Sequence, residues 1–262
     1  MNNIKFVTFN LRCVWKSDDN WGDGINDFIH RVGFIYDKIT AEQPDILAFQ
    51  EAQRQHLELL EKMLPEYSFY GQFRDADFTG EGIYTAVRKD RFQTLSFDTY
   101  WISPTPYVPG SRYENQSECP RICVTVKVRD KVSGRIFRTF NVHLDHISDE
   151  ARVQGMQCVL DRAELYLAED DVPFIIAGDF NAQPDSQVIK MCSEYKKHEI
   201  FDVTDKIEAT FHNWGKCAEK IDYIYVTGDI KKTVKEVYTW DDTKDGIYLS
   251  DHYPVCMEFD LK

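Results

Sequence analysis

Apolar segments that run directly into an acid, a carboxamide or a histidine leave this chain few possible folds. Six motifs of this kind occur: four end an apolar segment, one opens such a segment and one stands just before it. A strand with a polar end places that side chain at the rim of its sheet, where α/β folds collect ligands. A single Asp there is ordinarily a turn former, but six motifs together predict one shared site. In chain order they are FN at 9–10, FQE at 49–51, NVHLDH at 141–146, GDFN at 178–181, IDY at 221–223 and SDH at 250–252.

Helix-like and strand-like segments alternate along the chain. Apolar residues recur at helical spacing over 26–42, 57–64 and about 148–169, and Ser148 is a suitable N-cap for the last of these. Pro184 and Asp185 are expected to open a further, short helix. Helices among many strands predict an α/β protein with either two mixed sheets or one large one, which periodicity alone does not distinguish. The expected strands cover 4–10, 45–51, 83–87, 92–101, 122–128, 136–144, 173–177, 221–226, 234–240 and 255–259.

The net charge and the domain organisation limit the possible functions. No repeat, low-complexity tract or flexible linker interrupts the sequence, so we expect a single domain over residues 1–262. The chain has 44 acidic and 31 basic residues, a net charge of −13, and the basic residues are dispersed. Proteins that track a long polyanion ordinarily carry a basic stripe, so the charge favours a small substrate over nucleic acid. A bound metal ion could still make an acidic cleft locally positive.

Composition also bears on location. A strand-like pattern from Ile4 leaves no room for a signal peptide, and no stretch approaches the roughly 18 to 20 apolar residues of a membrane span. The seven cysteines are scattered, and the close pair Cys119 and Cys123 lacks a second pair at zinc-ribbon spacing. We therefore expect buried free thiols in a cytoplasmic, monomeric protein.

Oxygen donors dominate the six motifs. The carboxylates of Glu51, Asp179 and Asp251 and the carboxamides of Asn10 and Asn181 suit Mg²⁺ or Mn²⁺, whereas zinc favours imidazole or thiolate. Carboxylates gathered at one rim repel each other unless a cation neutralises them. Mg²⁺ usually completes its coordination with water and substrate phosphate. The sequence therefore predicts a Mg²⁺ or Mn²⁺ site that is completed by a phosphate oxygen of the substrate.

The motifs resemble those of the endonuclease/exonuclease/phosphatase superfamily, the deoxyribonuclease-I-like metal-dependent phosphoesterases. GDFN and SDH are weak signals as isolated strings, but six motifs in order over nearly the whole chain are specific. The chain looks like a small, bacterial-type, stand-alone member, and the resemblance implies a four-layer α/β sandwich, two mixed β-sheets packed face to face with helices outside. The matching segments are Thr8-Phe9-Asn10, Gln50-Glu51, Asn141-Val142-His143-Leu144, Gly178-Asp179-Phe180-Asn181, Ile221-Asp222-Tyr223 and Ser250-Asp251-His252.

The resemblance also implies roles for the acids and amides. Glu51 is similar to the principal metal ligand of the superfamily, with Asn10 and Asp251 supporting the metal directly or through water. Asp179 would orient or deprotonate the attacking water, and Asn181 would hold that water or a phosphate oxygen. These five residues would together bind the metal and activate the nucleophile.

The histidines complete the implied catalytic set. His252 would contact the phosphoryl group as a proton donor or an electrostatic stabiliser, and Asp222 would fix the orientation of its ring. His143 occupies the place of a second phosphate-contacting side chain.

Further polar and aromatic residues are candidates for specificity. Arg121, Asp145, His146 and Glu81 could bind substrate, although each could equally form a salt bridge within a loop. The residues Trp15 and Trp21 and the aromatic-rich stretch 98–113 could wall a pocket, but packing at an edge explains them as well.

Three functions remain open from the sequence. The first is hydrolysis of a small organic phosphate, for example a sugar phosphate or a lipid-headgroup phosphodiester. The second is an exo- or endonuclease of the same superfamily, with HLDH at 143–146 resembling its deadenylase-like branch. The third is a catalytically inactive binding protein on the same fold, which should lack at least one of Glu51, Asp179 or His252, and all three are present. Because fold does not fix function, the substrate depends on the site itself.

Overall fold

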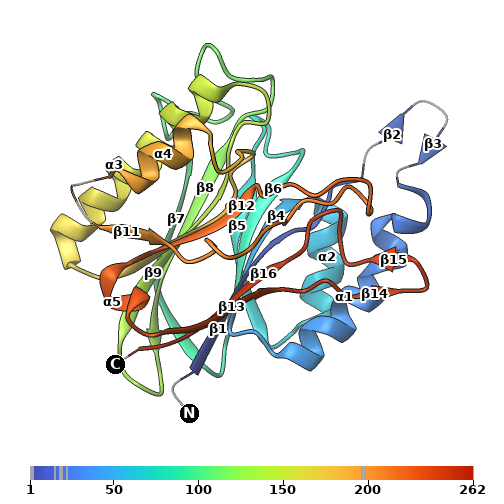
Figure 1. Ribbon diagram of the computed structural model, residues 1–262, viewed down its shortest axis with the longest axis horizontal. Helices are drawn as coiled ribbons and strands as arrows, with labels where there is room; N and C mark the ends of the chain where they lie inside the picture. The colour runs from blue at the N-terminus through green and yellow to red at the C-terminus, as the bar shows by residue number, and fades with distance from the viewer. Residues whose placement is uncertain are drawn as a thin grey trace.

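Two six-stranded β-sheets packed face to face form the centre of the protein (Figure 1). The computed structural model describes residues 3–14, 16–17, 20–21, 23–195, 197 and 199–261. From edge to edge, the first sheet contains β13 (Val234–Thr239), β16 (Val255–Asp260), β1 (Asn3–Asn10), β4 (Ile46–Ala52), β6 (Gly82–Arg88) and β5 (Tyr67–Phe73). The second contains β11 (Ile200–Asp202), β12 (Asp222–Thr227), β10 (Phe174–Asp179), β9 (Ile136–His143), β8 (Ile122–Asp130) and β7 (Phe92–Trp101).

The remaining elements are helices and two short ribbons. The ribbons pair β2 (Lys16–Ser17) with β3 (Asn20–Trp21) and β14 (Thr243–Lys244) with β15 (Ile247–Tyr248). The helices are η1 (Gly24–Asn26), α1 (Phe28–Glu42), α2 (Arg54–Met63), α3 (Asp149–Asp170), α4 (Gln187–Ser193) and α5 (Gly228–Lys231). Within the described residues, no helix is both long enough and apolar enough to cross a bilayer.

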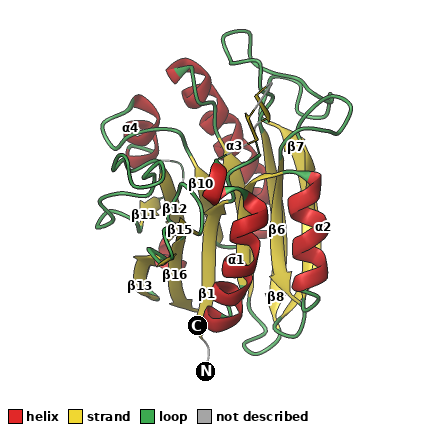
Figure 2. Ribbon diagram, turned by 90° about the vertical axis from the view of Figure 1, so that its right-hand side faces the viewer, coloured by secondary structure: helices red, strands yellow, loops and turns green. Residues whose placement is uncertain are grey.

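Helices cover the outer faces of both sheets. α1 and α2 pack on the first sheet through a cluster that includes Ile35 and Phe49, and α3 and α4 pack on the second through one that includes Phe140 and Leu160. The two helix pairs lie on opposite sides of the sheets in Figure 1, and Figure 2 looks onto α1 and α2. The expected sandwich of two mixed sheets with helices outside is therefore confirmed, and the alternative of one large sheet is wrong.

Strand alternation divides the layer between the sheets into two parts. Side chains alternate between faces along a strand, so Ile4 and Phe6 of β1 point toward the second sheet, as do Thr8 and Asn10 further along. The central strands thus turn from apolar to polar along the same face. We call the part around Ile4, Phe6, Phe137, Ile175 and Phe259 the apolar end, and the part around Asn10, His143, Asp179 and Asp222 the cleft end.

Parallel pairing brings the polar ends together. β1 and β4 run parallel with Asn10 beside Gln50, and β9 and β10 run parallel with His143 beside Asp179. β12 runs antiparallel to β10 and begins opposite Asp179, so its first residue also lies at the cleft end. Two parallel pairs with their carboxyl ends at the same rim explain why distant motifs converge.

A buried polar link separates the two ends. The Gln50 side-chain nitrogen donates to the Asn141 carboxamide oxygen at 2.7 Å, which joins β4 of one sheet to β9 of the other. The Asn141 nitrogen in turn donates to the backbone oxygens of Phe49 and Tyr84, both at 3.2 Å. Both carboxamides are fully buried, so the hydrogen bond between them and the bonds of Asn141 to Phe49 and Tyr84 fix how the sheets face each other.

Most of the expected elements are present, with two corrections. The Ser148 hydroxyl accepts from the Ala151 backbone N–H at 3.2 Å and caps α3, as expected. The short helix begins at Gln187 rather than at Pro184, because Ser186 is its extended N-cap. The expected elements do not include β5, β11, α5 or the four ribbon strands. The seven cysteines are free, but only four of them are buried, namely Cys13, Cys123, Cys192 and Cys256.

Candidate active site

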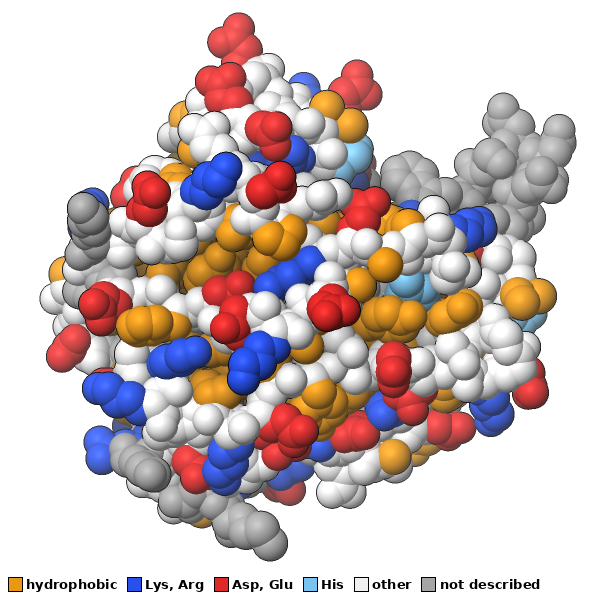
Figure 3. Space-filling view, viewed as in Figure 1, with side chains coloured by type: hydrophobic (Ala, Val, Ile, Leu, Met, Phe, Trp, Pro, Cys, Tyr) orange, Lys and Arg blue, Asp and Glu red, His pale blue; other side chains and the backbone are white. Residues whose placement is uncertain are grey.

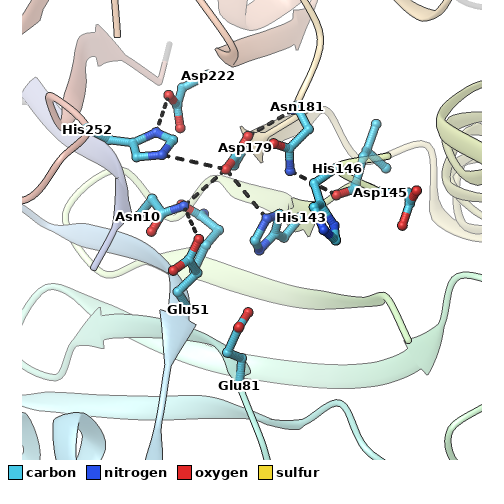
Figure 4. Close-up of polar contacts among 12 residues, drawn as sticks. Asn10, Glu51, Glu81, His143, Asp145, His146, Asp179, Asn181, Asp222 and His252 are labelled. Atoms are coloured by element: carbon cyan, nitrogen blue, oxygen red, sulfur yellow. Dashed lines mark hydrogen bonds and ion pairs between the residues drawn. The ribbon is translucent and has the colours of Figure 1, made fainter. Parts of the chain in front are cut away.

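A polar cleft of about 810 Å³ opens at the cleft end of the two sheets. Of the residues assigned from the sequence, Glu51, His143, Asp179, Asn181, Asp251 and His252 line it together. Asn10 and Asp222 contact these residues from just behind the surface (Figure 4). The six motifs therefore form one constellation in space.

Glu51 enters the cleft because β4 departs from regular pairing. Between Phe49 and Ala52 the register with β6 shifts by one residue, and Glu51 has a left-handed φ of 55°. On a regular strand Glu51 would share the face of Phe49, toward the helices. Because a non-glycine residue in this region costs roughly 1 to 3 kcal/mol, the bulge persists only with compensating contacts. Its carboxylate accepts from the Cys13 backbone N–H at 2.8 Å.

Asn10 joins the two sheets at the centre of the site. Its side-chain nitrogen donates to the carboxylates of Glu51 and Asp179, each at 3.0 Å (Figure 4). Its oxygen accepts from the Arg12 backbone N–H at 2.9 Å, which fixes the direction of the carboxamide. Asn10 therefore holds Glu51 and Asp179 at a set spacing and presents its nitrogen, not its oxygen, to them.

Asp179 is held rigidly at the end of β10. Gly178 permits the close approach of β10 to β9, because a Cβ there would lie 1.9 Å from the Val142 backbone oxygen. The Asn181 backbone N–H donates to Asp179 at 2.8 Å, and the Asn181 side chain donates to the Leu144 backbone oxygen at 3.1 Å. In the GDFN motif, Gly178 thus lets β10 lie close to β9, and Asn181 fixes the orientation of the Asp179 carboxylate.

His252 and Asp222 form a buried pair. Nδ1 of His252 lies 2.8 Å from the Asp222 carboxylate, and Nε2 lies 3.9 Å from that of Asp179. Burial alone would lower the pKa of His252, but Asp222, Asp179 and Asp251 raise it to about 10. The imidazole is therefore a cation at neutral pH, with one N–H bound to Asp222 and the other facing the cleft.

His143 has the opposite character. Its Nε2 lies 3.5 Å from the Asp179 carboxylate, on the other side from His252 (Figure 4). Burial and the nearby Arg121 guanidinium hold the pKa of His143 well below its usual value. Asp179 therefore lies between one charged and one neutral imidazole.

The carboxylates of the cleft are crowded. Burial and the neighbouring Asp222 raise the pKa of Asp179 to about 7, and burial together with Glu51 raises the pKa of Asp251. Glu51, His143 and Asp179 each offer one ligand atom, and these atoms lie within 4.8 Å of one another. Two carboxylates and one imidazole this close together form a mainly oxygen donor set that suits a hard divalent cation.

Arginines counter part of this negative charge. Arg12 forms an ion pair with Asp23 at 3.0 Å and reaches Asp251 at 3.6 Å. Arg12 and Arg74 line the cleft and were not identified from the sequence. Arg12 follows Asn10 by two residues at the end of a strand, a signal that could have identified it. Arg74 follows the unexpected β5 and gave none.

The proposed substrate-binding residues divide into two groups. Arg121, His146 and Glu81 line the cleft, where Arg121 contacts His146 Nδ1 at 2.9 Å and Glu81 pairs with Arg74 at 2.6 Å. Asp145 does not line it. That carboxylate accepts from Ser117 and from the Ile147 and Ser148 backbone N–H groups, and so holds the loop before α3.

The aromatic-rich stretch 98–113 does not contribute to this cleft, although its Tyr113 lines a separate hollow beside α3. None of its aromatic residues lines the cleft, and the Trp101 indole is buried and donates to the Arg74 backbone oxygen at 2.6 Å. Phe211 is the aromatic side chain among the described lining residues, and its ring lies 4.9 Å from that of His252. Trp15 and the side chain of Trp21 lie outside the described residues.

Comparisons with known proteins agree with this geometry. The sequence model of the Endonuclease/Exonuclease/phosphatase family matches residues 7–252. An uncharacterized protein of Acanthamoeba polyphaga mimivirus is 26% identical over 249 residues, which cover 88% of this chain and 91% of that protein.

Solved structures extend the similarity over the full length. An endonuclease/exonuclease/phosphatase from Bacteroides vulgatus has a TM-score of 0.89 and 27% identity, with 100% of each chain covered. A mannosyl-6-phosphatase from Bacteroides thetaiotaomicron has a TM-score of 0.83 and 25% identity, with 97% of this chain and 98% of that chain covered.

Proposed function

This chain belongs to the Endonuclease/Exonuclease/phosphatase family of hydrolases, and from that premise we propose that it is a Mg²⁺- or Mn²⁺-dependent phosphoric ester hydrolase that acts on a small phosphorylated substrate. The observation that carries the proposal is the meeting of Glu51, Asp179 and His252 in one cleft, with Asn10 bridging the two carboxylates at 3.0 Å. A catalytically inactive protein would have no reason to maintain a strained Glu51 and a crowded set of buried acids.

Asp179 is the proposed acceptor of a proton from the attacking water. Asn10 and the Asn181 backbone N–H each bind one of its oxygens, so its orientation is fixed before substrate arrives. A positioned general base contributes typically about 10²- to 10⁴-fold in rate.

His252 is the proposed partner of the phosphoryl group. Asp222 fixes the ring through Nδ1, which directs the Nε2–H into the cleft. A fixed cationic donor stabilises the negative charge that develops on the phosphoryl oxygens, without reorganisation during the reaction. We propose His143 as a second, neutral phosphate contact.

We propose that Glu51 and Asp251 hold the divalent metal. Asn10 would support it by setting the position of Glu51, because its oxygen is bound to the Arg12 backbone. When bound, the ion would neutralise the crowded carboxylates and polarise a phosphoryl oxygen.

Charge distribution supports a small substrate. Four arginines line the cleft of a chain whose net charge is −13, and Figure 3 shows acidic and basic side chains interspersed over one face, without a basic stripe. The related Bacteroides thetaiotaomicron mannosyl-6-phosphatase supports a sugar phosphate as the first compound to test. A single domain over 1–262, a monomeric state and a cytoplasmic location stay predictions.

The test is hydrolysis of matched substrates. The protein is incubated with hexose 6-phosphates, p-nitrophenyl phosphate, bis-p-nitrophenyl phosphate and short RNA or DNA, each with Mg²⁺, Mn²⁺ or chelator. We expect metal-dependent release of phosphate from a small ester, and loss of that activity in His252→Ala but not in His30→Ala, which removes an exposed histidine of α1.

Other results would redirect or end the proposal. Cleavage of oligonucleotides alone would establish the nuclease alternative. Hydrolysis that survives chelation, or full activity in His252→Ala, would contradict the mechanism.

A further inference from the structure

Arg31 is a charged side chain buried where the helical pattern of α1 places apolar ones. It lies on the inward stripe of α1 between Phe28 and Ile35, and only 1% of its surface is exposed. Among the described residues, no carboxylate oxygen lies within 4.0 Å of a guanidinium nitrogen of Arg31, so Arg31 forms no ion pair with them. A buried guanidinium without such a partner is costly unless its N–H groups find other acceptors.

The acceptors are backbone carbonyls of three separate segments. Nη1 donates to the Leu249 oxygen at 2.6 Å, and Nη2 donates to the oxygens of Leu11 at 2.9 Å and Arg12 at 3.3 Å. Nε donates to the oxygen of Asn26, just before α1. The planar fork of arginine thus joins the end of β1, the turn before α1 and the loop before β16.

Two of these segments carry the walls of the cleft. Leu11 and Arg12 follow Asn10 and precede Cys13, whose backbone N–H binds Glu51. Leu249 precedes Asp251 and His252 by two and three residues. None of the Arg31 contacts is to a side chain of the cleft, so Arg31 acts on the site through the backbone.

A fourth segment, the loop that contains Trp214, contacts the same guanidinium. The Trp214 ring lies 5.4 Å from it, in cation–π contact. The backbone N–H groups of the preceding residues His212 and Asn213 donate to the backbone oxygen of Asp251, at 2.9 and 3.2 Å. Asp251 is therefore held from both sides by segments that meet at Arg31.

We propose that Arg31 is a positioning residue that sets the distance between the Glu51 wall and the Asp251 wall of the cleft, and through it the affinity for the divalent metal. The metal part rests on the proposed function. Lysine offers a single nitrogen on a flexible stem, so it cannot bind all these carbonyls in the same fixed geometry.

The first test measures binding of Mn²⁺ alone by isothermal titration calorimetry. Loss of a group that orients metal ligands typically weakens metal affinity about 10- to 100-fold, and we expect this for Arg31→Met, with Arg31→Lys intermediate. The matched control is Arg91→Met. Arg91 is equally a buried arginine, paired with Asp130 at 2.7 Å where β7 begins and β8 ends, so its loss should lower stability and leave the Kd for Mn²⁺ unchanged.

The second test is amide hydrogen exchange without metal. In Arg31→Lys, residues 11–13 and 249–252 should lose protection together, whereas in Arg91→Met they should keep it. A wild-type Kd in folded Arg31→Lys or Arg31→Met, or exchange changes confined to α1, overturns the inference. If the wild-type protein binds no Mn²⁺, the proposed function fails, and the exchange result still decides whether Arg31 couples the two walls.

Discussion

The apolar end and the cleft end of the inter-sheet layer are built from the same strands, yet they use opposite chemistry. At the apolar end, Phe137 packs edge-on against Phe92 and Phe259, with ring centroids 5.8 Å apart in both pairs. At the cleft end, the same face of the same sheet carries His143 and Asp179. The comparison teaches that one strand can stabilise the fold with its first half and carry the polar side chains of the cleft on its second.

The two ends should also respond differently to mutation. Dispersion and apolar burial at the apolar end raise the free energy of unfolding. The buried acids of the cleft repel each other and lower it in the absence of a cation. Four predictions follow this contrast from the largest expected effect to the smallest.

Asp179→Asn should separate activity from stability most strongly. We expect a loss of kcat of about 10²- to 10⁴-fold, because the proposed proton acceptor is removed while the size of the side chain is kept. The free energy of unfolding should stay equal or rise, since one member of the crowded set becomes neutral. Steady-state kinetics beside urea unfolding measure both quantities, with Asp170→Asn on α3 as the control. A large loss of stability in Asp179→Asn would contradict the division between the ends.

Phe137→Ala should do the reverse. Removal of a fully buried aromatic ring from the apolar end should lower the free energy of unfolding by about 3 to 5 kcal/mol. At a temperature where the variant is folded, its KM and kcat should resemble those of the wild-type protein. Loss of activity in fully folded Phe137→Ala would show that the core also tunes the site.

Asn141→Ala tests the boundary between the ends. It leaves the buried Gln50 carboxamide and the backbone oxygens of Phe49 and Tyr84 with fewer partners, a cost of about 1 to 3 kcal/mol in unfolding free energy. Because Gln50 adjoins Glu51, activity should also fall, but less than in Asp179→Asn. The double variant Gln50→Leu/Asn141→Leu removes both partners and should recover part of the stability.

Glu42→Gln should have the smallest effect. Glu42 accepts from Lys5 at 2.8 Å and from Lys38 at 2.9 Å on the partly exposed outer surface, and these hydrogen bonds lower the pKa of its carboxyl against the opposing effect of burial. A lowered pKa stabilises the folded state above the ordinary value near 4.5, and this contribution is lost as the pH falls through the lowered pKa. The difference in unfolding free energy from wild type should be about 1 kcal/mol or less at pH 7 and vanish in acid.

The sequence predicts more of this molecule than periodicity alone allows. The polar strand ends identify Asn10 and Asp179, because an apolar run that stops at a polar residue is a local signal. The pairing of sheets is not local, so the choice between one sheet and two depended on the resemblance. Asp145 shows the limit of prediction from the sequence. It lies between His143 and His146, and the sequence does not distinguish an acid that binds substrate from one that holds a loop through hydrogen bonds.

Other features lie beyond any local pattern. The inward turn of Glu51 depends on a register shift against β6, a partner 30 residues away in the chain that no window of the sequence includes. Arg74 approaches the cleft only because β5 pairs at the sheet edge, and Arg31 replaces an apolar residue in an otherwise regular helical stripe. Each reflects contacts made after the strands assemble.

The bulge in β4 makes the Glu51 wall of the cleft depend on strand register as well as on residue type. If this segment paired regularly with β6, Glu51 would share the face of Phe49 and point toward α1 and α2, although every site residue would still be present in the sequence. Grafting the same glutamate onto an unbulged strand of a designed sandwich would fail for the same reason. A relative that keeps all six motifs but pairs this segment without the bulge would carry the sequence motifs of the family and lack a glutamate in the cleft.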